Sequence, residues 1–245
     1  MDDLLSNLRI HISEVIYIKD PESSDLGKRI INGSIKLIDR IGFEDFNFRK
    51  LATEIDSTEA SVYRYFENKH KLLLYLIAWY WGCMEYRLVF SLANVALPWE
   101  RLKRAVDLLT GITEPDGIFS QMDMITLKRI VITESSKAYL TKDVDQENKN
   151  GVFSGYKRLV ERISDIILEI NPHYPYPHML VSTVVESSHH QRFYADHLPK
   201  LTDTIKGEDS ISCFCWDIVL KSIKYWENSK KNPAKKTIGK YDKAS

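Results

Sequence analysis

The stretch NFRKLATEIDSTEASVYRYFENKHKL, residues 47–72, decides the fold of this chain. Leu51 and Ile55 lie one helical turn apart, and so do Val62 and Phe66. The spacing predicts two short helices, each with a single apolar stripe. Because helices this short cannot bury a core by themselves, we expect both to pack on a neighbouring element.

The break between these two helices is typical of a tight turn. Asp56-Ser57 interrupts the apolar spacing, and Asp tolerates a left-handed backbone better than most residues. Thr58 is a favourable N-cap for the second helix. The preceding segment offers the apolar stripe on which both can pack: Ile31, Ile35 and Ile38. The three helices together predict a helix-turn-helix, whose second helix can enter a major groove.

The same residues resemble the DNA-binding domain of the TetR family of bacterial repressors. The resemblance covers roughly residues 26–75 and rests on motifs at fixed spacing: Gly42-Phe43, Arg49-Lys50-Leu51-Ala52, Val62-Tyr63-Arg64-Tyr65-Phe66 and Asn68-Lys69. It implies an all-α, TetR-like fold, in which a three-helix N-terminal helix-turn-helix domain is joined to a larger helical ligand-binding and dimerisation domain. Two positions depart from the family pattern: Asp56 replaces the usual Gly, and Ser57 replaces the Val that usually follows.

The chain divides into four expected parts: an N-terminal arm (1–25), the helix-turn-helix DNA-binding domain (26–72), a helical ligand-binding and dimerisation domain (73–229) and a basic flexible tail (230–245). Apolar residues of the arm stand at helical spacing and predict an extra helix packed on its own chain: Leu4, Leu8, Ile12 and Val15. Further helices are expected from Asn68 to about Ala96 and over 99–111, 118–140, 146–170, 176–196 and 209–228. With no strand pattern and no internal repeat, the chain is predicted to be all-α.

Composition is that of a soluble globular protein, with 44% hydrophobic and 28% charged residues among 245. No stretch approaches the roughly 20 apolar residues of a membrane span, and the acidic N-terminus does not resemble a secretory signal. Three cysteines, Cys83, Cys213 and Cys215, make no disulfide framework, so a reducing cytoplasm is expected. Residues 26–75 hold nine basic and seven acidic groups, so DNA binding must depend on geometry and dimerisation more than on bulk charge.

The residues expected to contact DNA begin with the first short helix. Asn47 is its expected cap, and Arg49 in its first turn can reach a phosphate or a guanine edge. Glu59, Ala60 and Ser61 open the second helix, where base edges are met. Ala60 and Ser61 permit close approach, whereas Glu59 either repels phosphate or accepts from a cytosine amino group.

Four later residues complete the expected DNA contacts. Because Val62 and Phe66 take the buried stripe, Tyr63, Arg64 and Tyr65 are predicted to lie largely outside it: the phenol hydroxyls would donate to phosphates. The family resemblance points to the same role for Tyr63 and Tyr65. Asn68 caps the long helix and places Lys69 at its first position, where a cation opposes the helix dipole unless a phosphate binds there.

The last helix, 209–228, has two apolar stripes, one with Ile211, Phe214, Cys215, Ile218 and Tyr225 and another with Trp216, Val219, Ile223 and Trp226. A helix apolar on two sides is buried on two sides. In the TetR family the two terminal helices form a four-helix bundle with those of a second subunit. We therefore expect a homodimer through the helices near 176–196 and 209–228. A central helix in a monomeric bundle is the alternative.

A ligand cavity is expected between the long helix and the helices near 118–140, 146–170 and 176–196. Its candidate lining mixes apolar residues with a few polar anchors, as pockets do: Tyr80, Met84, Arg87, Leu88, Met122, Ile125, Arg129, Phe153, Tyr156, Val185 and Glu186. Arg87, Arg129 and Glu186 would be the anchors. The same residues also fit an ordinary core, where Met and aromatic side chains fill gaps.

A second interpretation comes from Glu186, His189 and His190, since Glu-x-x-His on a helix is found in di-iron carboxylate bundles. Such sites need a second pair and further glutamates, which the sequence does not supply nearby, so a polar rim or dimer seam is the plainer interpretation. No catalytic motif and no cofactor-binding motif is visible. The alternative function is thus a metal-binding or enzymatic helical bundle.

The main hypothesis is a homodimeric transcriptional regulator, a repressor of near-palindromic operator DNA with an unknown small-molecule effector and no membrane partner. In the family, the effector enters the larger domain and shifts the two DNA-reading heads out of register. Such a switch requires that the effector bind the DNA-free state more tightly. The sequence names neither the effector nor the operator.

Overall fold

The computed structural model describes residues 10–111 and 123–231, with side chains described as far as Tyr225. Within these ranges the regular elements are helices, and the chain forms two compact units. Unit 1 holds residues 10–89 and 123–159, and unit 2 holds residues 90–111 and 160–231. The expected all-α architecture is confirmed for these residues.

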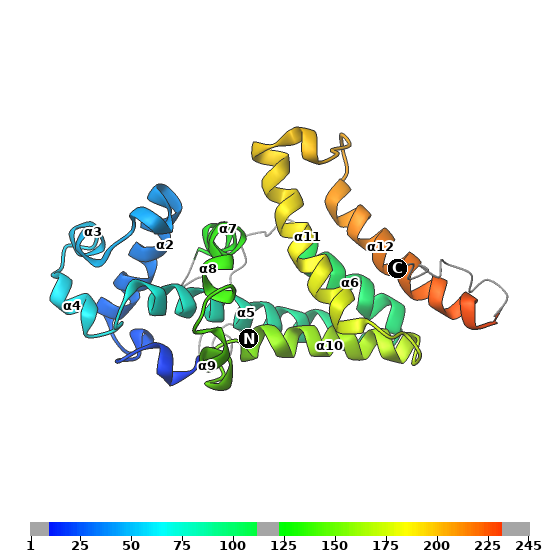
Figure 1. Ribbon diagram of the computed structural model, residues 1–245, viewed down its shortest axis with the longest axis horizontal. Coiled ribbons are helices and arrows are strands. Elements are labelled where there is room, and N and C mark those ends of the chain that lie inside the picture. The colour runs from blue at the N-terminus through cyan, green and yellow to red at the C-terminus, as the bar shows by residue number, and fades with distance from the viewer. Residues whose placement is uncertain (1–9, 112–122, 232–245) are drawn as a thin grey trace, which may run out of the picture. The chain divides into compact units, whose positions relative to one another are not determined.

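Unit 1 contains the helix-turn-helix and the helices packed around it, as labelled in Figure 1. Its elements are η1 (Glu14–Ile16), η2 (Pro21–Ser23), α2 (Asp25–Asp45), α3 (Phe48–Glu54), α4 (Glu59–Tyr63), most of α5 (Lys69–Leu92), α7 (Met124–Glu134), α8 (Ser136–Tyr139), α9 (Val144–Lys149) and the start of α10 (Ser154–Ile170). Unit 2 contains the ends of α5 and α10 with α6 (Pro98–Thr110), α11 (Pro177–His197), η3 (Pro199–Leu201) and α12 (Ser210–Lys231).

The apolar stripes predicted for the helix-turn-helix are confirmed. Leu51, Val62 and Phe66 are fully buried, and Ile55 is only 8% exposed. Ile31, Ile35 and Ile38 of α2 are buried as well. The close contact with α3 is made instead by Gly33, where a Cβ would lie 2.3 Å from Ile55 Cγ2, and Gly33 lies on the opposite side of α2 from Ile31 and Ile35. Helices α3 and α4 pack on each other, and α3 packs on α2. Because helices this short are not stable by themselves, burial against their neighbours stabilises them.

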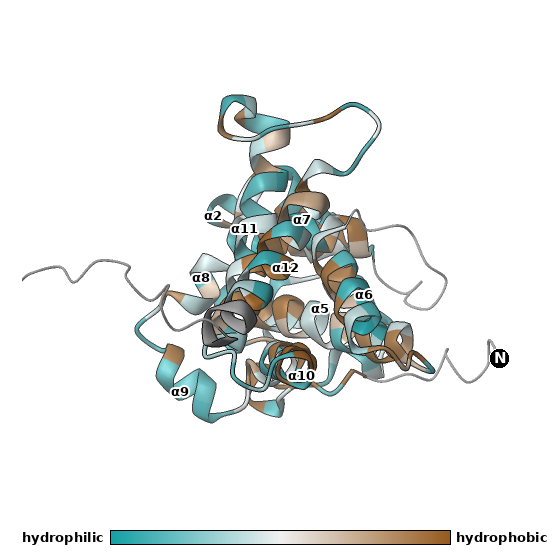
Figure 2. Ribbon diagram, turned by 90° about the vertical axis from the view of Figure 1, so that its right-hand side faces the viewer, coloured by the Kyte–Doolittle hydropathy of each residue, from teal (hydrophilic) through white to brown (hydrophobic). Residues whose placement is uncertain are grey.

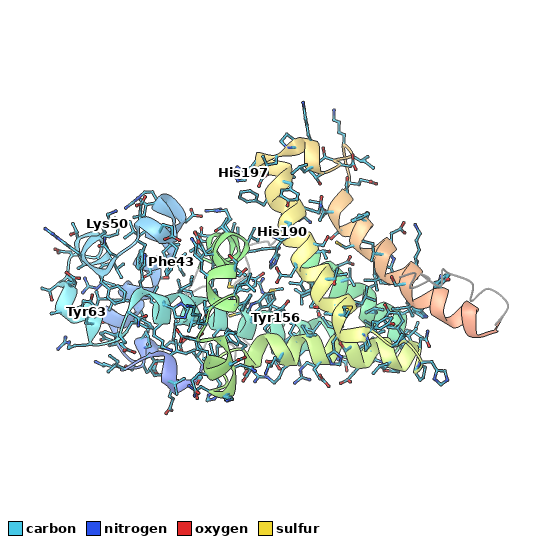
Figure 3. The ribbon with its side chains drawn as sticks, in the orientation of Figure 1. Phe43, Lys50, Tyr63, Tyr156, His190 and His197 are labelled. Atoms are coloured by element: carbon cyan, nitrogen blue, oxygen red, sulfur yellow. The ribbon has the colours of Figure 1, made fainter. Side chains whose placement is uncertain are left out.

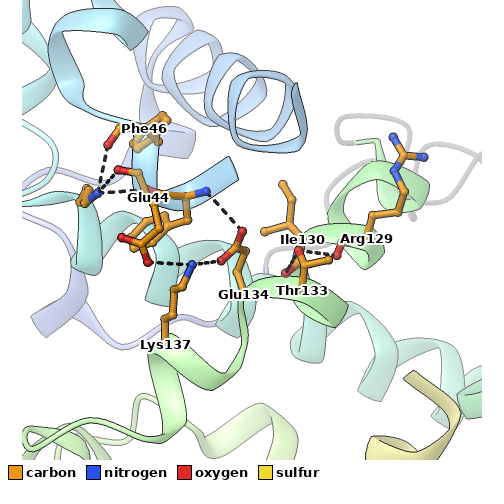
Figure 4. A network of polar contacts seen from close by, with 9 residues as sticks. Glu44, Phe46, Arg129, Ile130, Thr133, Glu134 and Lys137 are labelled. Carbon is orange, nitrogen blue, oxygen red and sulfur yellow. Dashed lines mark hydrogen bonds and ion pairs between the residues drawn. The ribbon is translucent and has the colours of Figure 1, made fainter. Parts of the chain in front are cut away.

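Helix α2 is broken at Gly42, which has φ 75° and ψ 159°. The break frees backbone groups of the following turn, and side chains from α7 and α5 satisfy them, while Lys137 of α8 pairs with two glutamates beside them (Figure 4). The Phe43 amide donates to Glu134 Oε1 at 3.2 Å, and Lys137 Nζ bridges Glu134 Oε2 at 2.6 Å and Glu44 Oε1 at 2.9 Å. Since Glu134 is only 7% exposed, this is a buried polar connection between α2 and α7.

Several predicted helices end differently. The long helix ends at Leu92 because Asn94 adopts a left-handed conformation, φ 61°. The predicted helix 146–170 is two helices, interrupted at Gly151 with φ 77°. The predicted helix 118–140 is α7 and α8 in its described part, 123–140. Residues 1–9, 112–122 and 232–245 lie outside the described residues, together with the expectations for Leu4, Leu8, Met122 and most of the tail.

The prediction of a helix in the arm is wrong for residues 10–13, and only the short 3-10 helices η1 and η2 form in residues 14–24. Ile10, Ile12 and Ile16 are buried, whereas Val15 is 51% exposed. In an extended chain, alternate side chains point to the same side, which explains why Ile10 and Ile12 are both buried. Ile10 packs so closely on α5 that a Cβ at Gly82 would lie 2.3 Å from Ile10 Cγ2.

Unit 2 buries aliphatic side chains of α6, α10, α11 and α12. They surround a cavity of about 10 Å³, too small for more than a water molecule, and are Leu102, Val106, Leu109, Ile163, Ile167, Leu180, Val181, Val184 and Val219. Figure 2 shows hydrophobic stripes on α6 and α10, in contrast to the mainly hydrophilic α9. In the described part of the chain no helix is long and apolar enough to span a membrane.

Candidate DNA-binding surface and effector region

Side-chain caps fix the two helices of the helix-turn-helix. Asn47 Oδ1 accepts from the Lys50 amide at 2.9 Å, and Thr58 Oγ1 accepts from the Ser61 amide at 3.2 Å. Asp56 takes the left-handed conformation required by the turn, φ 52°. These caps and the turn were predictable because each depends on residues close in sequence.

The outer face of α3 and α4 carries most of the predicted DNA contacts. Arg49, Glu59, Ala60 and Arg64 are exposed, and Ser61 is half-buried beside Thr58. Tyr63 is 47% exposed, with its ring edge-on to Phe48 at 4.9 Å between centroids, and it marks the outer side of α4 in Figure 3. The structure thus places these residues on one surface. That they contact DNA stays a prediction.

Tyr65 does not lie on that surface. Its side chain is only 2% exposed, and its hydroxyl is 2.7 Å from Ser24 Oγ, a contact that holds the pKa of the phenol below its usual value. The expectation that Tyr65 lies outside the buried stripe is therefore wrong. Helix α4 ends at Tyr63, so the next residues no longer follow helical spacing and Tyr65 turns inward.

Lys69 stands at the start of α5 as predicted, with Asn68 Oδ1 accepting from the Lys71 amide at 2.9 Å. Its ammonium donates to the carbonyls of Phe43, Glu44 and Phe46 at 3.0, 3.0 and 3.2 Å (Figure 4). All three ammonium donors thus have protein acceptors. The cation stabilises the free carbonyls at the end of α2, a role that sequence spacing does not reveal because the two segments lie 23 to 26 residues apart.

The predicted effector residues are divided between the units. Within unit 1, Tyr80, Met84 and Leu88 are buried in α5, and burial raises the pKa of Tyr80 while the charge of Arg87 lowers it. Phe153 and Tyr156 join an aromatic cluster in which Trp81 and Tyr156 stack with centroids 4.1 Å apart (Figure 3). Val185 and Glu186 belong to unit 2. The predicted cavity and its lining stay a prediction.

Two residues of the predicted cavity, Ile125 and the proposed anchor Arg129, lie toward the surface of unit 1. Ile125 is 38% exposed, and Arg129 makes a bidentate ion pair with Asp39 of α2 at 2.8 Å for both bonds. This geometry gives Arg129 a structural partner within its own chain. A fixed α2–α7 contact is therefore the role that the structure supports for it.

Glu186, His189 and His190 do not converge. His189 is 4% exposed, whereas His190 is exposed and stacks on Tyr194 with centroids 6.1 Å apart (Figure 3). Burial raises the pKa of Glu186. No group of three or more His, Cys, Asp or Glu side chains among the described residues could hold a metal ion, so nothing in that part of the chain favours the di-iron interpretation.

Helix α12 keeps two apolar sides, with a changed membership. Its buried stripe is Ile211, Cys215, Val219 and Ile223. On the other side, Phe214 and Tyr225 are 54% and 53% exposed and Ile218 is half-buried. A groove of about 460 Å³ adjoins Phe214, and its other lining residues are Gln191, Leu201, Thr202, Asp203, Ile205, Glu208, Ser210, Ile211, Cys213 and Asp217.

Comparison with known proteins gives a family for the N-terminal part. The family model described as "Bacterial regulatory proteins, tetR family" matches residues 30–76. A search of curated proteins gave no match.

Solved structures resemble the chain over most of its length. The fatty acid degradation regulator FadR from Bacillus halodurans has a TM-score of 0.55 at 15% identity, covering 80% of this chain and 93% of that one. The superantigen PfiT has a TM-score of 0.54 at 13% identity, covering 82% and 97%. The transcriptional regulator FadR from Bacillus subtilis, in complex with stearoyl-CoA, has a TM-score of 0.54 at 16% identity, covering 80% and 96%. At these identities the likeness concerns the fold.

The capped short helices, the left-handed turn and the exposed face of α4 define a helix-turn-helix DNA-binding protein built from helices. The family match assigns residues 30–76 to the DNA-binding domain of TetR-family bacterial regulatory proteins. Together with the regulators of similar fold, it supports a DNA-binding transcriptional regulator.

Proposed function

We propose that the chain acts as a homodimeric repressor that binds a near-palindromic operator and leaves it when a small-molecule effector binds. The observation that carries the DNA-binding part is the division of α4. Val62 is fully buried, while Glu59, Ala60, Tyr63 and Arg64 of the same short segment are exposed. A helix held this firmly on one side and open on the other is suited to the major groove.

The homodimer part is supported by the exposed apolar side of α12, with Phe214, Ile218 and Tyr225. Two identical heads read two half-sites about one helical turn apart, so an inverted repeat is expected in the operator. Homodimerisation also compensates for the weak net charge of the DNA-binding residues, because two specific contacts act together.

The experiment is an in vitro selection of duplexes from randomised DNA with the full chain, followed by fluorescence anisotropy on the selected duplex. We expect an inverted repeat and an affinity at least about 1,000-fold above that for random duplex. Light scattering of the protein alone should give a dimer. Failure to enrich any duplex would refute operator recognition.

Effector release is tested on the selected complex. Because the structurally similar regulator from B. subtilis was solved with stearoyl-CoA, acyl-CoAs of different chain lengths are the first probes, with free CoA as the control. A ligand that binds the DNA-free state more tightly must lower DNA affinity by the same factor by which DNA lowers its own affinity. A reporter gene behind the selected duplex distinguishes repression from activation.

A further inference from the structure

The N-terminal arm contacts Tyr65, two residues after the end of α4. The Ile18 amide donates to the backbone carbonyl of Tyr65 at 2.8 Å. The Tyr65 hydroxyl lies 2.7 Å from Ser24 Oγ, and Lys19 Nζ lies 5.1 Å from the centre of the Tyr65 ring. Backbone, hydroxyl and ring of one residue are thus all engaged by residues 18–24.

The arm is in turn anchored on helices of unit 1 that are not part of the helix-turn-helix. Ile10 occupies the space above Gly82, and the ring of Tyr17 packs edge-on against Tyr75 of α5 with centroids 6.1 Å apart. Glu22 Oε1 accepts from Trp79 Nε1 at 3.0 Å. Ser13 Oγ donates to the Asn150 carbonyl, just after α9, at 2.7 Å.

We propose that residues 10–24 form a clamp that fixes the end of the recognition helix α4 relative to α5, with Tyr65 as the positioning residue. This proposal rests on the proposed DNA-binding function. Helix α4 has only five residues, too few to hold its own geometry. Val62 and Phe66 anchor it from the core side, and the clamp fixes the polypeptide as it leaves the helix.

The clamp explains why Tyr65 is buried although it belongs to the motif that also supplies Tyr63 and Arg64. Tyr63 and Arg64 are exposed and can contact DNA. Tyr65 is held by the arm, and its contacts fix the backbone next to these two residues. A misplacement of about 1 Å in a recognition element weakens several contacts together, as it does in active sites. The clamp therefore affects DNA affinity without contacting DNA.

The test exploits the exposed side chain of Ile18, which is 65% exposed. The variant Ile18→Ala keeps the amide that donates to Tyr65, and Ile18→Pro removes it. Amide hydrogen exchange of the full chain should rise about five- to ten-fold over residues 58–66 in Ile18→Pro relative to Ile18→Ala, the change expected for one lost hydrogen bond. Exchange over α3 should stay unchanged.

The second pair of variants is Tyr65→Phe and Tyr63→Phe, each of which removes one hydroxyl. Only Tyr65→Phe should raise exchange over residues 58–66. Affinity for the selected duplex should fall about five- to ten-fold in Ile18→Pro and Tyr65→Phe, with Ile18→Ala at the parent value.

Three results would overturn the clamp: equal exchange in Ile18→Pro and Ile18→Ala, an equal rise over α3 that indicates global destabilisation, or an affinity loss confined to Lys19→Ala, which would show the arm contacting DNA directly. The exchange measurement needs no DNA. A parent protein that selects no duplex would therefore refute the proposed function while leaving the clamp measurable.

Discussion

The helix-turn-helix and the α11–α12 region bury apolar stripes in the same way, yet they differ in what they leave exposed. The outer face of α3 and α4 is polar and aromatic, with Arg49, Glu59 and Arg64. The outer side of α12 is apolar, with Phe214 and Tyr225. A polar exposed face suits a charged, hydrated partner such as DNA, whereas an apolar one suits a second protein surface. The two regions thus point to two kinds of partner.

The largest expected effect is on the apolar side. Ile218→Glu would place a carboxylate in the proposed dimer contact, where an unpaired charge is costly. We expect a monomer at micromolar concentration and at least about 100-fold weaker binding to the selected duplex, because one head is lost from each complex. Light scattering and anisotropy measure both.

The control for that variant is Lys221→Glu, which adds acidic charge to an exposed position of the same helix. Lys221 pairs with Asp217 on the surface, and such pairs contribute about 0–1 kcal/mol. If the parent protein is already monomeric, or if the Ile218→Glu variant stays dimeric, the apolar side of α12 is not a dimer contact.

The second effect tests the buried connection between α2 and α7. Glu134→Leu removes the acceptor of the Phe43 amide and one of the two partners of Lys137, so the buried amide loses its acceptor. We expect a loss of about 1–3 kcal/mol in the free energy of unfolding, measured by urea denaturation. Glu44→Gln changes the exposed partner of Lys137 and should cost less than about 1 kcal/mol. Equal losses would contradict the buried role of Glu134.

Sequence alone predicted the parts of the helix-turn-helix that depend on near neighbours. Asn47 caps the Lys50 amide, Thr58 caps the Ser61 amide and Asp56 takes the left-handed turn. Each interaction spans three residues or fewer, so the local pattern contains all the information needed.

The roles of Tyr65 and Lys69 were not predictable in this way. The partner of Tyr65 is Ser24, 41 residues earlier, and the carbonyls that bind Lys69 follow a break in α2 at Gly42. Both contacts form only in the tertiary structure, and helical spacing gives no information about residues so far apart in sequence. The arm was mispredicted for a related reason, since Ile10 is buried by its contact with Gly82 of α5 and not by a helix of its own.

A third, smaller effect sharpens the assignment of the polar face. Arg64→Ala removes an exposed guanidinium next to Tyr63, and we expect a loss of about 1–2 kcal/mol in binding to the selected duplex, with the unfolding free energy unchanged within about 0.5 kcal/mol. If Arg64 reads a base, a repeated selection with the variant will show relaxed preference at one position. Uniform weakening on all duplexes would assign it to a phosphate instead.

The smallest effect concerns Arg129, which sequence placed in the effector cavity and the structure pairs with Asp39. The guanidinium is more than half exposed, so solvent screens the pair, and Arg129→Ala should lower the unfolding free energy by at most about 1 kcal/mol. Asp39→Asn is the matched control, because it breaks the same pair while leaving the arginine in place. If Arg129 serves only this contact, the two variants will have equal stability and equal affinity for any acyl-CoA that binds. An acyl-CoA affinity that falls in Arg129→Ala but not in Asp39→Asn would restore the arginine to the effector site. The same result would show that this α2–α7 contact and effector binding share a residue.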